Sequence, residues 1–288
     1  MTVFLQSVLS GVLVGGVYAL IGVGLTIIFG VMRVINFAHG ELLMLGMYLT
    51  WILFSTLGLD PYLALVLTAP ALFLWGAFLQ KVFINRVLNA LPQNQILLTI
   101  GLGLIMSNTV MLIYTSDYRI LTTSYSSSSF LLGDLSVSKP LLYSFLVTAA
   151  ITAALAWFLL RTDTGQAIRA TAQDREAAQL MGINVQFTSV LAFGIGSALA
   201  GAAGALISPT YYIFPQVGSA FTLKAFVIVV LGGMGSIVGA TLGGLIIGVT
   251  ESMAAIYVAS GLKELVVFVL FLGLLLFKPS GLMGKSRA

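Results

Sequence analysis

Few residues of this chain have side chains that could carry out covalent chemistry or hold a metal ion. The sequence contains no cysteine and a single histidine, His39, which excludes disulfides, a thiolate nucleophile and a multi-histidine metal cluster. We predict no catalytic residue, no metal site and no cofactor. The triplet at residues 284–286, Gly-Lys-Ser, is similar to the end of a phosphate-binding loop. That motif needs a glycine where this chain has Pro279, so the chain itself is not expected to bind ATP.

The polar residues that could contact a passing solute lie in two interruptions of apolar sequence. The first, residues 31–46 (VMRVINFAHGELLMLG), contains Arg33, Asn36, His39 and Glu41. Ionisable groups at membrane depth are costly and usually face a bundle interior or a water-filled cavity. Asn36, Phe37 and Gly40 suit an unwound or re-entrant turn, whose backbone groups must be satisfied by protein or water. For Glu41 we expect a structural role, as a partner of Arg33 or of a helix N-terminus.

The second interruption, within residues 223–244, is rich in glycine. Gly232, Gly233 and Gly235 weaken a helix there, and Ser236 can cap a helix that restarts after them. Both interruptions have the order apolar run, break, apolar run, which is weak evidence for an internal repeat of the kind found in transporters. Two interpretations stay open: these residues line a translocation path, or they only hold packed helix breaks.

Residues 161–186 form a polar segment between two long apolar runs. It carries six charges: Arg161, Asp163, Arg169, Asp174, Arg175 and Glu176. We predict two short helices outside a membrane, the first capped by Asp163 and the second by Asp174. Gly182 stands where a glycine would end the second helix. Small and apolar residues between the charges make this surface suitable for docking to another protein.

The composition decides the fold class. The chain has 288 residues, of which 59% are hydrophobic and 8% are charged, whereas soluble domains carry about 25% charged residues. We predict one all-α, polytopic transmembrane domain over residues 1–288, with about nine membrane helices (eight to ten) and broken or re-entrant segments. The expected segments are 3–30, 41–57, 62–80, 95–115, 140–160, 187–207, 220–232, 237–257 and 261–277.

Basic residues in the connections predict the orientation of the helices. If the segments alternate, three basic regions fall on one side, which is then cytoplasmic: Lys81 and Arg86; Arg161, Arg169 and Arg175; Lys278, Lys285 and Arg287. The N-terminus then faces outward and the C-terminus inward. The Ser- and Thr-rich loop 116–139 is expected on the outer, periplasmic side, exposed and partly extended.

The segment from Gly165 to Ile183 reads G-x-A-x-R-A-x-x-x-D-x-x-A-A-x-L-M-G-I, and it resembles the coupling loop of bacterial ABC-importer permeases for branched-chain amino acids. In that family the cytoplasmic loop inserts into a groove on an ATPase subunit. The resemblance therefore implies that ATPase coupling involves Gly165, Arg169, Ala170, Asp174, Ala177, Ala178, Met181 and Gly182. It is extended by N-F-A-H-G-E near the N-terminus, L-G-G-M-G-S-I near residue 235 and F-K-P-S-G-L-M-G near the C-terminus.

The resemblance implies further properties of the protein. It implies a multi-pass protein of the bacterial inner membrane, with two cytoplasmic ATPases, a second related permease and a periplasmic binding protein as partners. The second permease is expected to be a different chain, with a homodimer as the alternative. Nucleic acid is not an expected partner, and membrane lipid is. A solute path would involve Asn36, Phe37, His39, Gly40, Gly232, Gly233, Gly235 and Ser236.

The alternative is a secondary transporter or channel that has no ATPase partner. Such a protein should contain buried acid–base pairs or a cation site. The sequence offers four candidates, and most of them lie near segment ends: Glu41, Glu251, Lys263 and Glu264. A membrane-embedded enzyme is a third class, and the chain shows no residue constellation for it.

Overall fold

The computed structural model describes residues 1–284, apart from the side chain of Leu132. Lys285, Ser286 and Arg287, considered above, lie outside the described residues. The elements are α1 (Thr2–Met32), α2 (His39–Leu57), α3 (Pro61–Val82), η1 (Ile84–Arg86), α4 (Pro92–Tyr114), β1 (Ser129–Leu132), β2 (Leu135–Ser138), α5 (Lys139–Arg161), α6 (Asp163–Gln173), α7 (Arg175–Leu180), α8 (Val185–Ile207), α9 (Val217–Gly232), α10 (Ile237–Tyr257), η2 (Ser260–Leu262) and α11 (Lys263–Phe277). The prediction of an all-α membrane protein is confirmed.

Eight helices in the described part of the chain are long and apolar enough to cross a membrane. They coincide with eight of the nine predicted segments. The remaining predicted segment, 220–232, corresponds to α9, which is apolar but has only 16 residues. Because a span needs about 20 residues, α9 is shorter than a full crossing.

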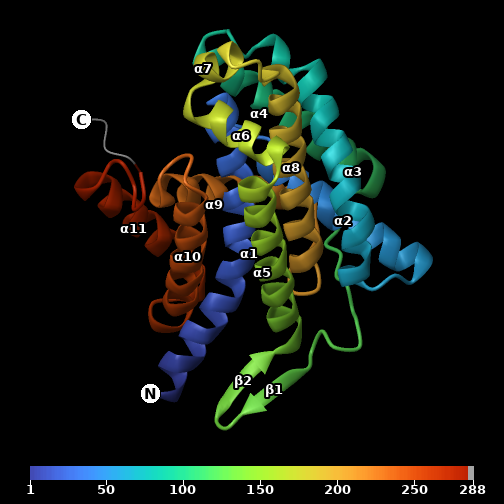
Figure 1. The fold of residues 1–288 in the computed structure, drawn as a ribbon. Helices are drawn as coiled ribbons and strands as arrows, with labels where there is room; N and C mark the ends of the chain where they lie inside the picture. The colour runs from blue at the N-terminus through green and yellow to red at the C-terminus, as the bar shows by residue number, and fades with distance from the viewer. Residues whose placement is uncertain (285–288) are drawn as a thin grey trace.

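The centre of the bundle is α1, which is largely buried by its neighbours (Figure 1). It packs closely against α10 because both helices present glycines four residues apart. A methyl group at Gly11 would lie 2.5 Å from Cα of Val249, and one at Gly15 would lie 2.9 Å from Cα of Leu245. Such spacing lets two helix backbones approach in lipid, where the hydrophobic effect does not drive association.

After α1 the chain turns back into the bundle. Arg33 ends α1 in the left-handed conformation, with φ of 54°, and residues 33–36 are not helical. His39 then begins α2 beside Ile21, since its Nε2 atom lies 3.1 Å from the Ile21 carbonyl oxygen. Ile21 is about three helical turns before the end of α1. The predicted break is therefore confirmed at residues 33–38. Gly40, which was expected in the turn, already belongs to α2, and α2 starts well inside the bundle.

Two ends of the molecule are distinguished by their short elements. Figure 1 shows α6 and α7 at one end, with the N-terminus and the β1–β2 hairpin at the other. The hairpin pairs Ser129 with Ser138 through Leu132 with Leu135, and it confirms that the 116–139 loop is partly extended. Gln6 of α1 holds it, donating to the Ser136 carbonyl at 2.6 Å and accepting from the Ser136 amide at 2.9 Å.

Candidate functional site

The polar segment folds as two short helices with side-chain caps. Asp174 caps α7, because its Oδ1 atom accepts from the amides of Glu176 and Ala177 at 2.9 and 3.0 Å. This part of the prediction is confirmed. The cap of α6 is Thr162, whose hydroxyl accepts from the Gly165 amide at 3.0 Å. The prediction of Asp163 at that position is therefore wrong by one residue, since Thr162 has the extended backbone that a cap needs and Asp163 is already helical.

Gly182 ends α7 as predicted. Its φ is 83°, and its amide donates to the Gln179 carbonyl at 3.0 Å. The Ile183 amide donates to the Ala178 carbonyl at 3.1 Å, which gives the pair of bonds typical of a glycine helix end. The chain then turns into α8, where Asn184 accepts from the Phe187 amide at 3.0 Å.

The eight predicted coupling residues divide between the surface and the layer beneath it. Gly165 and Ala178 are buried, and Gly165 lies directly on the last turn of α5, where a methyl group would be 2.6 Å from Cα of Leu159. Ala170 is half-buried. Five residues are exposed: Arg169, Asp174, Ala177, Met181 and Gly182.

The outer surface of this segment has an apolar tip beside an open groove. Leu180 and Met181 are 88% and 83% exposed, and they lie side by side in sequence outside the membrane-spanning helices. The groove, of about 530 Å³, lies along α6 and is lined by Leu160, Asp163, Gln166, Ala167, Arg169, Ala170, Gln173 and Ile183. A tip of this kind next to a charged groove suits a protein partner, and the predicted coupling residues include Met181 of this tip but not Leu180.

The first interruption is buried between α1, α4 and α9. Asn36 Oδ1 accepts from the Ala38 amide at 3.1 Å, and the Gly40 amide donates to Thr222 Oγ1 at 3.0 Å. Phe37 stacks on Phe226 of α9, with ring centroids 6.3 Å apart. Arg33 lies outside this cluster because it is exposed, and no ion pair joins it to Glu41 among residues 1–284. The expected pairing of Arg33 with Glu41 is therefore wrong.

The second interruption lies nearer the α6 end of the bundle. Ser236 caps α10 as predicted, because its hydroxyl accepts from the Gly239 amide at 3.0 Å. Gly233 and Gly235 have φ of 97° and 90°, which L-residues rarely adopt. Gly235 lies beside Gly30 near the end of α1, where a methyl group on Gly30 would be 3.9 Å from its Cα.

The segment after α11 closes this second turn. The amides of Leu282 and Met283 donate to the carbonyls of Leu231 and Gly232 at 2.8 and 3.0 Å. The two interruptions therefore do not share the same neighbours. The first contacts the beginning of α9, whereas the second joins the end of α9 to the C-terminal segment.

A buried ionic cluster joins α9, α10 and α11, and sequence reasoning missed its central contact. Lys224 Nζ lies 3.0 Å from both carboxylate oxygens of Glu251, and Lys263 Nζ lies 2.8 Å from Glu251 Oε1. Lys224 also donates to the Tyr18 hydroxyl at 3.2 Å, which is 3.0 Å from the hydroxyl of Tyr211. Lys224 and Glu251 both lie inside apolar helices, where charged groups are rarely without partners. The sequence therefore indicated that each has a partner, but not which residue that partner is.

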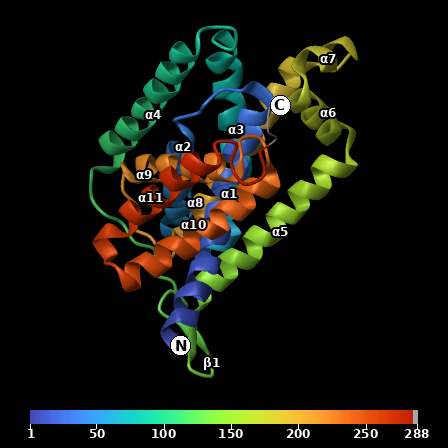
Figure 2. The same ribbon diagram turned by 90° about the vertical axis from the view of Figure 1, so that its left-hand side faces the viewer.

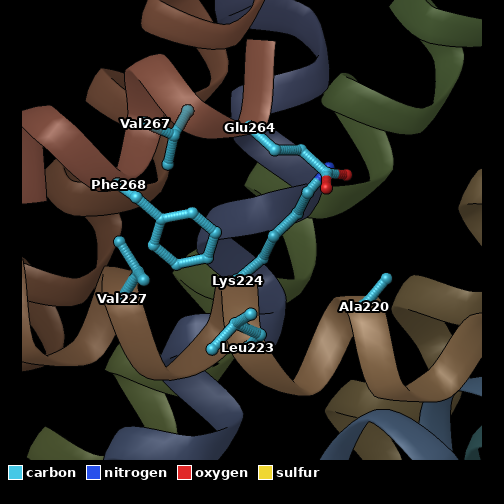
Figure 3. Close-up of a pocket in the computed structure, with 7 residues that line it drawn as sticks. All are labelled: Ala220, Leu223, Lys224, Val227, Glu264, Val267 and Phe268. Atoms are coloured by element: carbon cyan, nitrogen blue, oxygen red, sulfur yellow. The ribbon is translucent and has the colours of Figure 1, made fainter. Parts of the chain in front are cut away.

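A small cavity of about 30 Å³ lies beside this cluster, between α9 and α11. Figure 3 shows Lys224 of α9 and Glu264 of α11 extending toward one another at its rim. The other lining residues are apolar: Ala220, Leu223, Val227, Val267 and Phe268. The cavity has the volume of one or two small groups, so it does not hold a solute as large as an amino acid.

Known proteins of similar sequence are membrane permeases. Residues 7–276 match the family model described as the permease component of branched-chain amino acid transport systems. The chain is 35% identical over 298 residues to the high-affinity branched-chain amino acid permease BraD of Pseudomonas aeruginosa, covering 99% of this chain and 97% of BraD. It is 33% identical to LivH of Escherichia coli, with 99% and 96% covered. A probable LivH of Methanocaldococcus jannaschii is 29% identical, with 97% and 92% covered.

Proposed function

The chain belongs to the family of permease components of branched-chain amino acid transport systems, and we propose from this that it translocates such an amino acid, or a related small solute, as one subunit of an ATP-driven importer. The observation that carries the proposal is the identity of about one third along nearly the whole chain to permeases named for high-affinity branched-chain amino acid transport. ATP hydrolysis belongs to separate subunits, and this chain contributes the path.

Two cytoplasmic ATPases dock at the α6–α7 end of the permease pair. The apolar tip of Leu180 and Met181 enters a groove on the ATPase, and Arg169 and Asp174 make polar contacts around it. Gly165 and Ala178 act from beneath, because their small size lets α6 and α7 lie close to the bundle. Movement of the ATPases is transmitted through α6 to α5 and to the end of α1.

The transport mechanism is alternating access around the two interruptions. Asn36, Phe37, His39 and Gly40 lie on the path inside the bundle, and the turn from Gly232 to Ser236 lies at its cytoplasmic end. Half-helices whose ends meet inside a bundle are the usual construction of a solute site in transporters. The short α9, which connects both interruptions, is the helix we expect to move.

The orientation of the subunit follows from this placement. The α6–α7 end faces the cytoplasm of a bacterial cell, so the N-terminus and the β1–β2 hairpin face the periplasm, where a binding protein delivers the solute. The C-terminus is cytoplasmic. A second, related permease completes the path, with a second copy of this chain as the alternative. The chain is inserted in the inner membrane as one domain.

Co-purification tests the proposal. The tagged chain is extracted from native membranes in mild detergent, and bound proteins are identified by mass spectrometry. An ATPase and a second permease should be recovered with the wild-type chain. The matched variant Leu180→Ser, Met181→Ser should lose the ATPase and keep the second permease. Recovery of the chain alone would contradict the proposal.

One observation favours a second candidate function. The buried cluster of Lys224, Glu251 and Lys263 is the kind of acid–base arrangement that an ion-coupled secondary transporter uses. In that case the chain would transport without an ATPase, and its uptake would follow an ion gradient. The family relationship favours the importer, because the relatives are permease components of larger transport systems.

A further inference from the structure

Glu41 is a buried carboxylate that forms no ion pair within the described residues. It lies in the first turn of α2, and its side chain is 7% exposed. Its Oε2 atom is buried and has no hydrogen-bond partner within the described residues. No lysine, arginine or histidine nitrogen in that part of the chain lies within 4 Å of its carboxylate, because both ion pairs found there involve Glu251.

Two helix N-termini converge on this carboxylate. Glu41 belongs to the first turn of α2, and its carboxylate lies against Gly218 in the first turn of α9. A methyl group on Gly218 would be 2.5 Å from Glu41 Cδ and 2.9 Å from Oε1, so only glycine leaves room for the carboxylate there. Neither helix has a hydrogen bond from its own N-cap side chain, although the Gly40 amide of α2 donates to Thr222 Oγ1. The positive ends of two helices favour the ionised form, although burial opposes it.

The surroundings of Glu41 combine this charge with apolar and hydroxyl groups. Its methylene stem lies on α4, where a methyl group on Gly103 would be 3.4 Å from Cγ. Phe37, four residues before Glu41, stacks on Phe226 of α9, and Thr222 joins α9 to Gly40 and to the Phe37 carbonyl. Ser219, next to Gly218, is exposed, so the site lies just beneath the surface between α4 and α9. Figure 2 shows α4 standing to one side of the bundle.

We propose that the Glu41 carboxylate receives the α-ammonium group of the solute midway along the bundle. An unpaired buried carboxylate needs a cationic partner, and a zwitterionic amino acid supplies one during passage. The phenylalanine pair offers an apolar surface for the rest of the solute. The expected ligand class is therefore an α-amino acid with an uncharged, apolar side chain. The inference rests on the proposed transport function and adds the group that recognises the ammonium.

The substitution Glu41→Gln separates this role from a purely structural one. Glutamine has nearly the same shape as a protonated glutamate but carries no negative charge. If the carboxylate only fills space, the variant should transport normally. If it binds the ammonium, the loss of a charge-assisted hydrogen bond should lower uptake at least about tenfold. The control is Glu264→Gln, which neutralises an exposed glutamate of α11.

The experiment uses the assembled importer in proteoliposomes, with its binding protein outside and ATP inside. We measure the uptake of labelled leucine together with ATP hydrolysis stimulated by the liganded binding protein. Glu41→Gln should lose uptake and keep the stimulated hydrolysis, and Glu264→Gln should keep both. Uptake by Glu41→Gln within twofold of the wild type would overturn the inference and leave the importer function intact.

A second variant, Glu41→Asp, keeps the inference testable if Glu41→Gln does not assemble into the importer. Glu41→Asp keeps the charge and should transport better than Glu41→Gln or Glu41→Ala in the same vesicles. Equal uptake by the aspartate and alanine variants would overturn the inference. Absence of uptake by the wild-type assembly would instead reject the proposed function, and the ammonium site with it.

Discussion

Lys224 Nζ lies 3.0 Å from each carboxylate oxygen of Glu251, and the two residues lie inside the apolar helices α9 and α10. Lys263 shares the same carboxylate from the start of α11, at 2.8 Å, but its side chain is 34% exposed. The two lysines should therefore respond differently to loss of Glu251. Lys224 would remain a buried charge without a carboxylate, whereas Lys263 could turn toward the surface.

We expect Glu251→Gln to destabilise the protein by about 3–5 kcal/mol, as the removal of one partner of a buried pair does. Lys263→Met should cost less than about 1 kcal/mol, because its pairing is partly solvent-exposed. The midpoint of thermal unfolding in detergent compares them, with Glu264→Gln as the control. Equal shifts for Glu251→Gln and Lys263→Met would contradict this difference.

Gly182→Val should uncouple the ATPase without preventing membrane insertion. Nothing among the described residues lies within 4 Å of a methyl group at this position, but its φ of 83° would cost valine about 1–2 kcal/mol. The end of α7 would shift, and the exposed tip would no longer fit its partner. Substrate-stimulated ATP hydrolysis should fall in the assembled importer. Gly182→Asn is the matched control, since asparagine tolerates the left-handed region, and normal stimulation in the valine variant would count against the role of this tip.

Gly281→Val should detach the segment that closes the second interruption. Gly281 has φ of 76°, and a β-carbon there would lie 2.6 Å from the Gly233 amide nitrogen and the Val230 carbonyl oxygen. The bonds from Leu282 and Met283 would be lost, at about 1 kcal/mol each. Limited proteolysis should then cleave near residue 280 faster than in the wild type. Gly261→Ala, at an open position, should leave the cleavage rate unchanged, and the account fails if both variants behave alike.

Tyr125→Phe should loosen the loop of residues 116–139. The Tyr125 hydroxyl donates to Asp60 Oδ2 at 2.6 Å, while Asp60 Oδ1 accepts from the Tyr62 amide at the start of α3. Burial, and then the hydrogen bond to Asp60, raise the pKa of the Tyr125 hydroxyl. Because this pKa is higher in the folded protein, the stabilisation is complete at any pH below the pKa of the unfolded protein. The stabilisation is lost only as the pH rises through the pKa of the folded protein.

Tyr125→Phe should accordingly lower the free energy of unfolding by about 1–1.5 kcal/mol, and this decrease should be constant between about pH 6 and pH 8. Thermal unfolding at both pH values measures it. Tyr143→Phe is the matched control, because Tyr143 packs against Tyr62 and Tyr125 in the same aromatic cluster. If the substitution lowered the free energy of unfolding at the lower pH but not at the higher pH, Tyr125 would have to ionise in the native loop.

The order and type of the helices could be predicted because each depends on local sequence. Apolar runs of the right length predicted the membrane helices. Asp174 and Ser236 predicted helix starts because their side chains accept from nearby backbone amides, and Gly182 predicted a helix end because it adopts a positive φ. The cap of α6 was assigned one residue too late, since Thr162 and Asp163 are both good caps and the backbone chose between them.

Contacts between distant segments could not be predicted in the same way. The pairing of Lys224 with Glu251 depends on how α9 and α10 face each other, which a hydrophobic pattern without polar periodicity does not specify. Likewise, Arg33 is near Glu41 in sequence but is exposed, because the chain turns back after α1 and leaves Arg33 at the outside of the turn. The β1–β2 hairpin did have a local signal, the Gly133-Asp134 pair between short apolar runs.

Uptake by the purified assembly decides whether this chain works as the permease of an ATP-driven importer. Vesicles containing this chain, its co-purified permease and its ATPases receive labelled leucine with the binding protein outside. Uptake should require both ATP inside the vesicle and the binding protein outside, and no ion gradient should replace them. Uptake by this chain alone, driven by a proton or sodium gradient without ATP, would contradict the account and identify a secondary transporter.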